Sequence, residues 1–249
     1  MRLARCDDDA EIFYSIQGEG KTIGRPSVFV RLSLCNLYCY WCDTAYTWNW
    51  QGTAFPHITD GDTPAKFTKE NEIVTLDAAD VCERIHQFDC RNVVITGGEP
   101  LLQQDELSQL IDGLKKIDQS YQFEIETNAT LIPIDDIDRA SVQYNVSPKL
   151  SNSRVESARR LVDDALKWFA ACSRSHFKFV IETPDDLVEV QELVEQYEID
   201  LDRVYLMGEA MTLPELQEKQ EWLWTRCGAL GVNYSDRHHV RLYGSGRGV

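Results

Sequence analysis

Three cysteines, Cys35, Cys39 and Cys42, are spaced as Cys-x3-Cys-x2-Cys and follow an apolar run, 27–34, that predicts a β-strand. A compact loop with three thiolates can hold three corners of an iron–sulfur cube and leaves the fourth iron without a protein ligand, whereas structural clusters usually have four cysteine ligands. A zinc site would normally have a fourth Cys or His, and the five histidines are far from this loop in the sequence. The spacing therefore favours a cluster with an open iron and leaves zinc as the competing interpretation.

Three more polar segments directly follow predicted buried strands, at residues 96–100, 126–128 and 147–149. Sites in α/β sheets and barrels form outside the carboxyl ends of parallel strands, so we expect these segments to lie beside the cysteine loop. Taken singly, the Gly-Gly-Glu-Pro of the first segment and the Ser-Pro-Lys of the third are also compatible with ordinary turns. Four polar segments at one end of the sheet predict a shared site more strongly than any one of them does.

Arg31 lies in the middle of a predicted strand, among Val, Phe and Leu. A charged side chain in such a position is costly unless it is paired or faces a polar cavity. The planar fork of donors on arginine suits a carboxylate. Two partners therefore remain open from the sequence, namely the carboxylate of a ligand and an internal Glu of the protein.

Strands and helices are predicted to alternate from residue 75 onward, which is typical of a mostly parallel sheet built from right-handed βαβ units. The predicted strands are 27–34, 92–95, 123–127, 142–146, 177–181 and 204–207, with a last short strand at 240–243. The predicted helices are 76–88, capped by Thr75, then 104–116, 155–171, 184–197 and 213–229. About six parallel strands are fewer than the eight of a closed barrel, so the sequence predicts an α/β fold with an open or partial barrel.

The rest of the chain gives less regular patterns. We expect one domain over 1–249, with a short leader at 1–10 and an irregular, tryptophan-rich insertion or lid at about 45–72. The five cysteines outside the loop are scattered and are expected to be buried or partly buried thiols: Cys6, Cys82, Cys90, Cys172 and Cys227.

The net charge of −16 and the pI near 4.7 argue against nucleic-acid partners and against docking on anionic lipid. No apolar run approaches the roughly 18–20 residues of a membrane span. The first residues lack the apolar core of a signal peptide, so we expect a cytoplasmic protein without a disulfide framework.

Several motifs, taken together, resemble the 7-carboxy-7-deazaguanine synthase family of radical S-adenosylmethionine (SAM) enzymes. Besides the cysteines, they are Gln-Gly-Glu-Gly at 17–20, Trp-Cys-Asp-Thr at 41–44, Thr-Gly-Gly-Glu-Pro at 96–100, Glu-Thr-Asn at 126–128, Ser-Pro-Lys at 147–149 and the tail at 239–249. They are spread over nearly the whole chain. The resemblance implies a partial (β/α)6 barrel of the radical SAM type and a homodimer.

The resemblance also implies the chemistry. A [4Fe–4S] cluster on Cys35, Cys39 and Cys42 would bind SAM at its open iron and, with an electron from a donor such as flavodoxin or ferredoxin, release a 5′-deoxyadenosyl radical. The radical would convert 6-carboxy-5,6,7,8-tetrahydropterin to 7-carboxy-7-deazaguanine with loss of ammonia, using SAM catalytically, in queuosine or related deazapurine biosynthesis. The enzyme would thus be a carbon–nitrogen lyase.

The same resemblance implies roles for individual residues. The implied substrate contacts are Ile16, Gln17, Gly18, Glu19, Arg31, Thr96, His239 and the C-terminal carboxylate of Val249. The implied SAM contacts are Trp41, Cys42, Asp43, Gly98, Ser147, Pro148 and Lys149. Thr44 is the implied Mg²⁺ ligand, a hard oxygen donor of the kind that this cation prefers.

Overall fold

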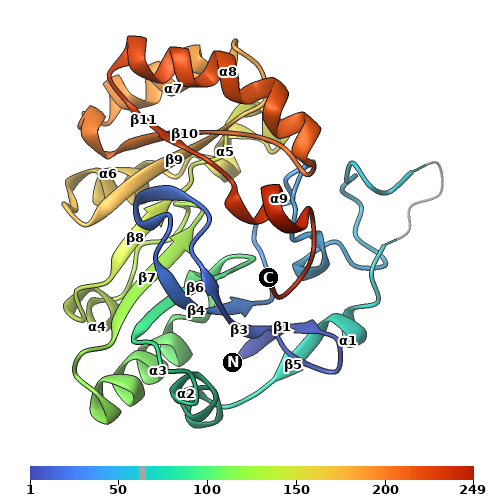
Figure 1. Ribbon diagram of the computed structural model, residues 1–249, viewed down its shortest axis with the longest axis vertical. Coiled ribbons are helices and arrows are strands. Elements are labelled where there is room, and N and C mark those ends of the chain that lie inside the picture. The colour runs from blue at the N-terminus through green and yellow to red at the C-terminus, as the bar shows by residue number, and fades with distance from the viewer. Residues whose placement is uncertain (62–65) are drawn as a thin grey trace.

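The structure is a computed structural model and describes residues 1–61 and 66–249. Its centre is a sheet in which seven described strands run parallel, in the order β4-β6-β7-β8-β9-β10-β11. Their bounds are β4 Pro26–Leu32, β6 Asn92–Gly97, β7 Gln122–Thr127, β8 Gln143–Val146, β9 Ser175–Ile181, β10 Val204–Gly208 and β11 Asn233–Ser235. In the described residues the sheet stays open between its end strands, which confirms the predicted α/β fold with a partial barrel (Figure 1).

The N-terminal residues extend this sheet with antiparallel strands beside β4, so the predicted leader at 1–10 is wrong. The strands are β1 Arg2–Cys6, β2 Asp9–Ala10, β3 Ile12–Ile16 and β5 Ile73–Thr75. β1 pairs with β2, β4 and β5, and β3 pairs with β4. Leu3 and Ala4 are fully buried. Two charged residues, Arg2 and Arg5, flank this short apolar pair and hide its strand character in the sequence.

Helices connect the parallel strands and cover the outside of the sheet, at positions close to those predicted (Figure 1). The longer helices are α2 Ala78–His86, α3 Gln104–Ile117, α6 Asp163–Ala171, α7 Asp186–Gln196 and α8 Leu213–Leu230. The short ones are α1 Lys69–Glu72, α4 Asp135–Arg139, α5 Ser157–Arg160 and α9 His238–Tyr243, with 3₁₀ turns at Gly20–Thr22, Ala45–Thr47, Pro100–Gln103, Ser151–Ser153 and Leu201–Arg203. None of the described helices has the length and apolar composition needed to cross a bilayer.

Caps explain where two of these helices begin and end. α2 begins two residues later than predicted, because the Asp77 side chain, not Thr75, accepts a hydrogen bond from the Asp80 N–H. α8 begins with a capping box between Thr212 and Glu215 and ends at Gly231, whose left-handed φ of 71° suits glycine.

The predicted helix at 155–171 is two helices, α5 and α6, separated by Leu161 and Val162, neither of which has helical backbone angles. The buried Arg160 side chain accounts for the break. It donates to the Val155 and Lys149 carbonyls at 3.1 and 2.7 Å and pairs with Glu189 at 2.6 Å. These bonds hold the end of α5 against the segment after β8 and against α7, rather than in line with α6.

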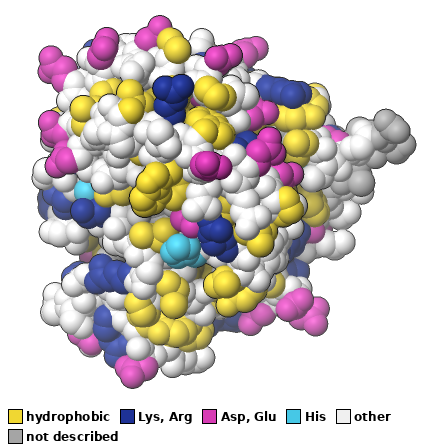
Figure 2. All heavy atoms as spheres, turned by 45° about the horizontal axis from the view of Figure 1, so that its top comes forward, with side chains coloured by type: hydrophobic (Ala, Val, Ile, Leu, Met, Phe, Trp, Pro, Cys, Tyr) yellow, Lys and Arg dark blue, Asp and Glu magenta, His cyan; other side chains and the backbone are white. Residues whose placement is uncertain are grey.

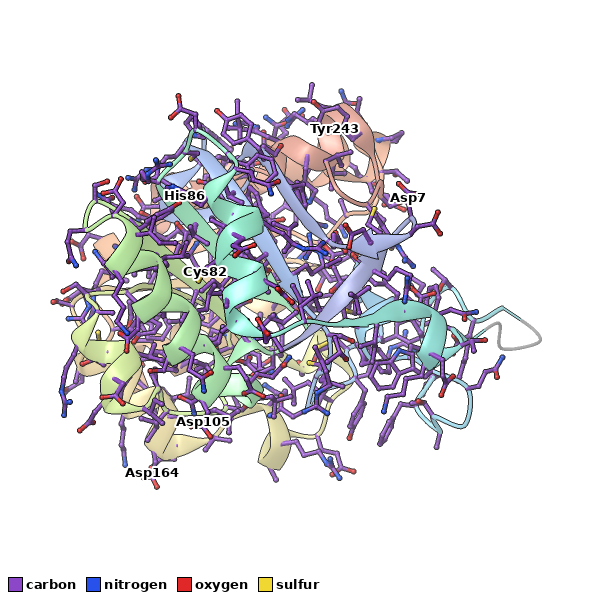
Figure 3. All side chains as sticks on the ribbon, turned by 90° about the horizontal axis from the view of Figure 1, so that it is seen from below. Asp7, Cys82, His86, Asp105, Asp164 and Tyr243 are labelled. Carbon is purple, nitrogen blue, oxygen red and sulfur yellow. The ribbon has the colours of Figure 1, made fainter. Side chains whose placement is uncertain are left out.

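The predicted last strand at 240–243 is the helix α9, and the last strand is β11 instead. Val, Tyr and Leu in this stretch favour a strand by propensity, but tertiary packing overrides propensity in short segments. Only Val240 is buried, in a small cluster with Ala210 and Leu216, whereas Leu242 and Tyr243 are exposed. Figure 3 labels Tyr243 on the outer surface of this helix.

The largest hydrophobic cluster lies between the sheet and the helices that cover it, and it includes the fully buried rings of Tyr121, Tyr144 and Phe169. Of the five scattered cysteines, three are buried and two partly buried, as predicted. Cys82, labelled in Figure 3, lies where α2 packs on α3, and its Sγ donates to the Leu110 carbonyl at 3.5 Å. On the face shown in Figure 2, acidic side chains are interspersed with basic and apolar ones.

Candidate active site

One cavity lies at the carboxyl ends of the parallel strands, and residues from all the predicted polar segments line it. Its wall includes nearly every residue predicted for the site, namely Ile16, Gln17, Gly18, Glu19, Arg31, Cys35, Cys39, Trp41, Cys42, Asp43, Thr44, Thr96, Gly98, Ser147, Lys149, His239 and Val249. Pro148 is not among the lining residues. The fold therefore brings together residues as far apart in the sequence as Ile16 and Val249.

The geometry of the three cysteines fits a group larger than a zinc ion. In the described part of the chain, the group of three candidate ligands that lie within 4.8 Å of one another is Glu19, Asp43 and His239, so the three sulfur atoms do not all lie within 4.8 Å of one another. Tetrahedral zinc, with sulfur at about 2.3 Å, would draw its ligands to within about 4 Å of one another. The wider spacing fits an iron–sulfur cube, whose cysteines bind different iron atoms.

His57 is the histidine nearest to the cysteine loop in the sequence, and both of its ring nitrogens have other partners. Nε2 lies 2.8 Å from the Cys42 carbonyl oxygen, and Nδ1 lies 2.8 Å from Thr59 Oγ1. His57 therefore supports the backbone of the loop rather than adding a fourth metal ligand. This contact weakens the zinc interpretation further.

Polar groups surround the sulfur atoms in the way that tunes iron–sulfur sites. The Leu37 N–H donates to Cys35 Sγ at 3.4 Å, and Thr44 Oγ1 lies 3.5 Å from Cys42 Sγ. Burial raises the pKa of all three thiols, that of Cys39 to about 12. Without a metal the thiols are thus neutral, and a cluster would displace their protons on binding.

The Gly97-Gly98 pair at the end of β6 packs backbone against backbone and is not a generic turn. Gly97 has a φ of 127°, and a Cβ there would lie 2.0 Å from the Leu32 carbonyl oxygen. A Cβ on Gly98 would lie 2.0 Å from the Leu34 carbonyl oxygen and 3.1 Å from the Cβ of Cys35. Only glycine permits this approach, which fixes the start of the cysteine loop.

Glu99, next in the chain, is fully buried and joins the ends of β6 and β7. Its carboxylate accepts hydrogen bonds from the backbone N–H groups of Leu101 and Asn128, at 3.0 and 2.7 Å, and from Thr127 Oγ1 at 2.9 Å. Asn128 in turn donates to Asn36 in the cysteine loop at 2.9 Å. The polar segments after β4, β6 and β7 are therefore physically connected.

Lys149 and Trp41 form the wall of the cavity near the cysteines. Lys149 Nζ donates to Ser147 Oγ at 2.8 Å and lies 5.8 Å from the centre of the Trp41 ring. The indole of Trp41 donates to Asn152 at 3.3 Å. This wall offers a cation, a hydroxyl and an aromatic face to a ligand in the cavity.

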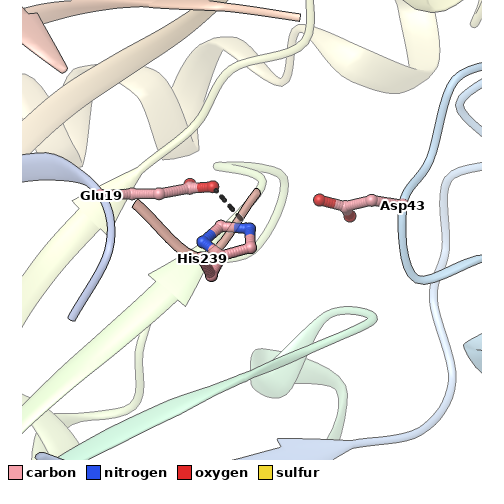
Figure 4. Close-up of side chains that lie close together, drawn as sticks. All are labelled: Glu19, Asp43 and His239. Carbon is pink, nitrogen blue, oxygen red and sulfur yellow. Dashed lines mark ion pairs between the residues drawn. The ribbon is translucent and has the colours of Figure 1, made fainter. Parts of the chain in front are cut away.

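A second wall is a cluster of charged and polar side chains, which we call the ion cluster: the buried Glu19, Lys178 and Arg237, the partly buried His239, and the exposed Asp43 that follows Cys42. Glu19 forms ion pairs with Lys178 and, at 2.9 Å, with Arg237, and His239 Nε2 lies 3.5 Å from its carboxylate. Arg237 also bonds to Asp43. Figure 4 shows the side chains of Glu19, Asp43 and His239 converging from three separate segments.

The charges of the ion cluster compensate one another. Burial opposes ionisation of Glu19, but the Lys178 and Arg237 charges outweigh it and hold the pKa of Glu19 well below its usual value. Arg237 likewise lowers the pKa of Asp43 against the effect of desolvation. Burial lowers the pKa of His239, which favours its neutral form. Because two cations already neutralise the two carboxylates, these residues form an ion-pair network rather than a ready metal site.

Arg31 pairs with an internal Glu, one of the two partners that the sequence allowed, and it also lines the cavity. Its Nε donates to Glu11 Oε1 at 2.8 Å, and Glu11 is 1% exposed. The Tyr46 hydroxyl donates to the same carboxylate at 3.0 Å. In the described residues, no acceptor bonds the terminal nitrogens of Arg31, so two of its donor groups remain for a ligand.

Two carboxylates beside the 17–22 loop, those of the buried Glu124 and the partly buried Glu126, were not predicted as site residues. Glu126 lines the cavity and accepts hydrogen bonds from Thr96 Oγ1 at 2.7 Å and Gln17 Nε2 at 3.1 Å. Glu124 accepts from Gln17 Nε2 at 2.8 Å and from Thr22, and thus anchors both ends of the 17–22 loop. Burial raises the pKa of Glu124 to about 7.

The sequence carried some signal for two of the site residues that were not predicted, Glu126 and Lys178, and none for a third, Arg237. Glu126 belongs to the Glu-Thr-Asn segment that follows β7. Lys178 is a charge inside an apolar strand, the same signal that drew attention to Arg31. Arg237 had no such signal, because its partner Glu19 is 218 residues away.

Comparison with known proteins gives a consistent result over nearly the whole chain. The profile of the Radical SAM superfamily matches residues 30–181. A 7-carboxy-7-deazaguanine synthase of Pyrobaculum aerophilum is 34% identical over 239 residues, covering 96% of this chain and 95% of the relative. One of Hyperthermus butylicus is 35% identical over 238 residues, covering 92% and 90%. The crystal structure of QueE from Escherichia coli aligns with a TM-score of 0.64 at 26% identity, covering 91% of both chains.

Proposed function

Since the chain belongs to the 7-carboxy-7-deazaguanine synthase family of the radical SAM superfamily, we propose that it converts 6-carboxy-5,6,7,8-tetrahydropterin to 7-carboxy-7-deazaguanine with loss of ammonia. The observation that carries this proposal is one cavity that both the cysteine loop and the ion cluster line. The first wall suits a radical-generating cofactor, and the second suits a polar ring with a carboxylate.

Cys35, Cys39 and Cys42 would hold the [4Fe–4S] cluster, and their wide spacing and N–H contacts fit it. When bound, the cluster and SAM would supply a 5′-deoxyadenosyl radical that takes a hydrogen atom from C6 of the substrate; 5′-deoxyadenosine would later return a hydrogen atom to the product radical, so that SAM is re-formed. We assign the SAM contacts to the wall that contains the Gly98 backbone and Lys149. Trp41, Cys42, Asp43, Ser147 and Pro148 complete that assignment.

The substrate would lie across the second wall. The pterin ring presents N–H groups that suit the carboxylates of Glu19 and Glu126 and the carbonyl oxygens of the 16–18 loop. Its carboxylate suits the two free donor groups of Arg31. Thr96, His239 and the carboxylate of Val249 would make the remaining contacts.

We further propose that Thr44 binds Mg²⁺ together with the substrate carboxylate, because a hard cation prefers oxygen ligands. The electron would come from a donor such as flavodoxin or ferredoxin. The proposal also includes a homodimer, a cytoplasmic location, and one domain over 1–249 with an insertion at 45–72 and a substrate-contacting tail.

Anaerobic reconstitution with iron and sulfide, followed by incubation with SAM, a reductant, Mg²⁺ and the carboxytetrahydropterin, tests the proposal. We expect 7-carboxy-7-deazaguanine as the product, with less than one SAM consumed per turnover. Cleavage of SAM without product would contradict the substrate assignment. A colourless protein with stoichiometric zinc, lacking the broad absorbance at about 400 nm of sulfur-to-iron transitions, would contradict the whole function.

A further inference from the structure

The last six residues, 244–249, form a glycine-rich tail that leaves α9 and lines the cavity. Gly244 and Gly248 have left-handed φ values of 63° and 68°. A chain with three glycines among six residues loses much conformational entropy when it is ordered, so a fixed position needs an anchor. In Figure 1 the C-terminus lies beneath α9, close to the strands at the β4 end of the sheet.

Arg247 is the residue of the tail that makes specific contacts. Its Nη1 donates to Glu72 Oε2 at 2.8 Å and to the Arg5 carbonyl at 3.3 Å. Its guanidinium lies 3.6 Å from the centre of the Tyr46 ring and 5.5 Å from that of Phe67. A planar guanidinium can stack on rings and pair with a carboxylate at the same time, which an ammonium cannot do as well.

Three of these four partners belong to the segment 45–72. Tyr46 lies in a 3₁₀ turn, Phe67 pairs with Trp50 in an isolated β-bridge, and Glu72 ends α1. The Glu72 side chain is 13% exposed, so it is less screened by solvent than an ordinary surface carboxylate. This otherwise irregular segment thus forms a receptor for Arg247.

The receptor is also connected to the substrate wall. The Tyr46 ring that contacts Arg247 carries the hydroxyl that donates to Glu11, and Glu11 holds Arg31 Nε. Tyr46 therefore contacts both Arg247, which anchors the tail, and Glu11, which holds Arg31. The tail and Arg31 both line the cavity.

We propose that Arg247 is a positioning residue that ties the tail to the segment 45–72 and thereby holds Val249 in the cavity. The segment 45–72 then has a specific role as the receptor of the tail. The consequence for catalysis rests on the proposed function, because it needs the tail carboxylate to contact the substrate. The docking of the tail does not rest on it.

The docking is tested by hydrogen exchange of the tail in the full, iron-loaded chain. Arg247→Ala should speed exchange of residues 244–248 by about tenfold, the effect of losing a stacked cation and its ion pair. Arg247→Lys should restore part of the protection, because it keeps the charge opposite Glu72 but stacks less well. Glu72→Gln should give an intermediate loss. Unchanged tail protection in Arg247→Ala would overturn the proposal.

Arg139→Ala is the matched control, since Arg139 forms exposed ion pairs with Asp135 and Asp136 on α4. It should leave the tail protected, and an equal loss there would also overturn the proposal. For the kinetic consequence, we expect Arg247→Ala to raise the KM for the pterin by about tenfold, more than it lowers kcat. If the protein is inactive on the pterin but hydrogen exchange of its tail still responds to Arg247→Ala, the proposed function is refuted and the docking of the tail stands.

Discussion

The two walls of the cavity are built in different ways. The cysteine loop is local: its three sulfur atoms come from eight consecutive residues, and its supports are neutral, such as the Leu37 N–H and the Thr44 hydroxyl. The ion cluster is assembled by the whole fold, because Glu19 finds Lys178 159 residues away and Arg237 218 residues away. The first wall depends on spacing in the sequence, and the second depends on charges that meet only when the chain is folded.

The difference predicts different responses to mutation. A change in the cysteine loop should remove the metal and leave the fold, since apolar packing by Leu37 and Val155 remains around it. A change in the ion cluster should weaken the fold itself, because Glu19, Lys178 and Arg237 are all at least 90% buried. Four substitutions test this contrast.

Cys39→Ala should have the largest effect on function. With two of three ligands left, we expect loss of the cluster and of all SAM cleavage, with a nearly unchanged urea midpoint. Iron content, absorbance near 400 nm, where sulfur-to-iron transitions fall, and SAM cleavage measure this. Cys90→Ala, at a buried cysteine outside the loop, should keep its iron. SAM cleavage by iron-loaded Cys39→Ala would contradict the ligand role.

Arg237→Met should have the largest effect on stability. It removes the cation between Glu19 and Asp43 and leaves the buried carboxylate of Glu19 undercompensated. Breaking a buried ion pair in this way lowers the free energy of unfolding by about 3–5 kcal/mol. Urea denaturation of the variant and of the exposed control Arg139→Met measures the difference. Equal, small losses in both variants would remove the contrast between the two walls.

Glu124→Gln should change how stability depends on pH. Folding raises the pKa of Glu124 from 4.5 to about 7, so between these values the folded chain holds a proton that the unfolded chain has lost. The wild-type free energy of unfolding should therefore fall, relative to that of the variant, by at most about 3 kcal/mol as pH rises from 4.5 to 7. Parallel stability curves from pH 4 to 8 would show that Glu124 does not titrate there.

Thr44→Ala should have the smallest effect of the four substitutions. Thr44 follows Cys42 of the cysteine loop and Asp43 of the ion cluster in the sequence. If its hydroxyl binds Mg²⁺, the concentration of Mg²⁺ needed for half-maximal turnover should rise about tenfold or more, while iron content stays constant. Thr44→Ser keeps the oxygen and should restore the wild-type response. An unaltered Mg²⁺ dependence in Thr44→Ala would place the cation elsewhere.

The sequence predicted the elements whose signals are local. Alternating apolar strands and helices gave the α/β class, and strand-end positions brought the polar segments to one cavity. It failed for β1, because Arg2 and Arg5 obscure the buried pair between them. It also failed for α9, where a segment with strand-like composition folds as a helix. It missed Arg237 because no local pattern encodes a contact across 218 residues.

The position of Arg237, His239 and the tail near the end of the chain has a consequence for synthesis on the ribosome. After the cysteine loop is made, about 200 further residues must be added before the ion cluster can close, which takes about 10–40 s at 5–20 residues per second. During that interval Glu19 lacks its arginine, and the cavity lacks one wall. The part of the chain that would hold iron is thus available to maturation factors well before the part that would hold substrate exists.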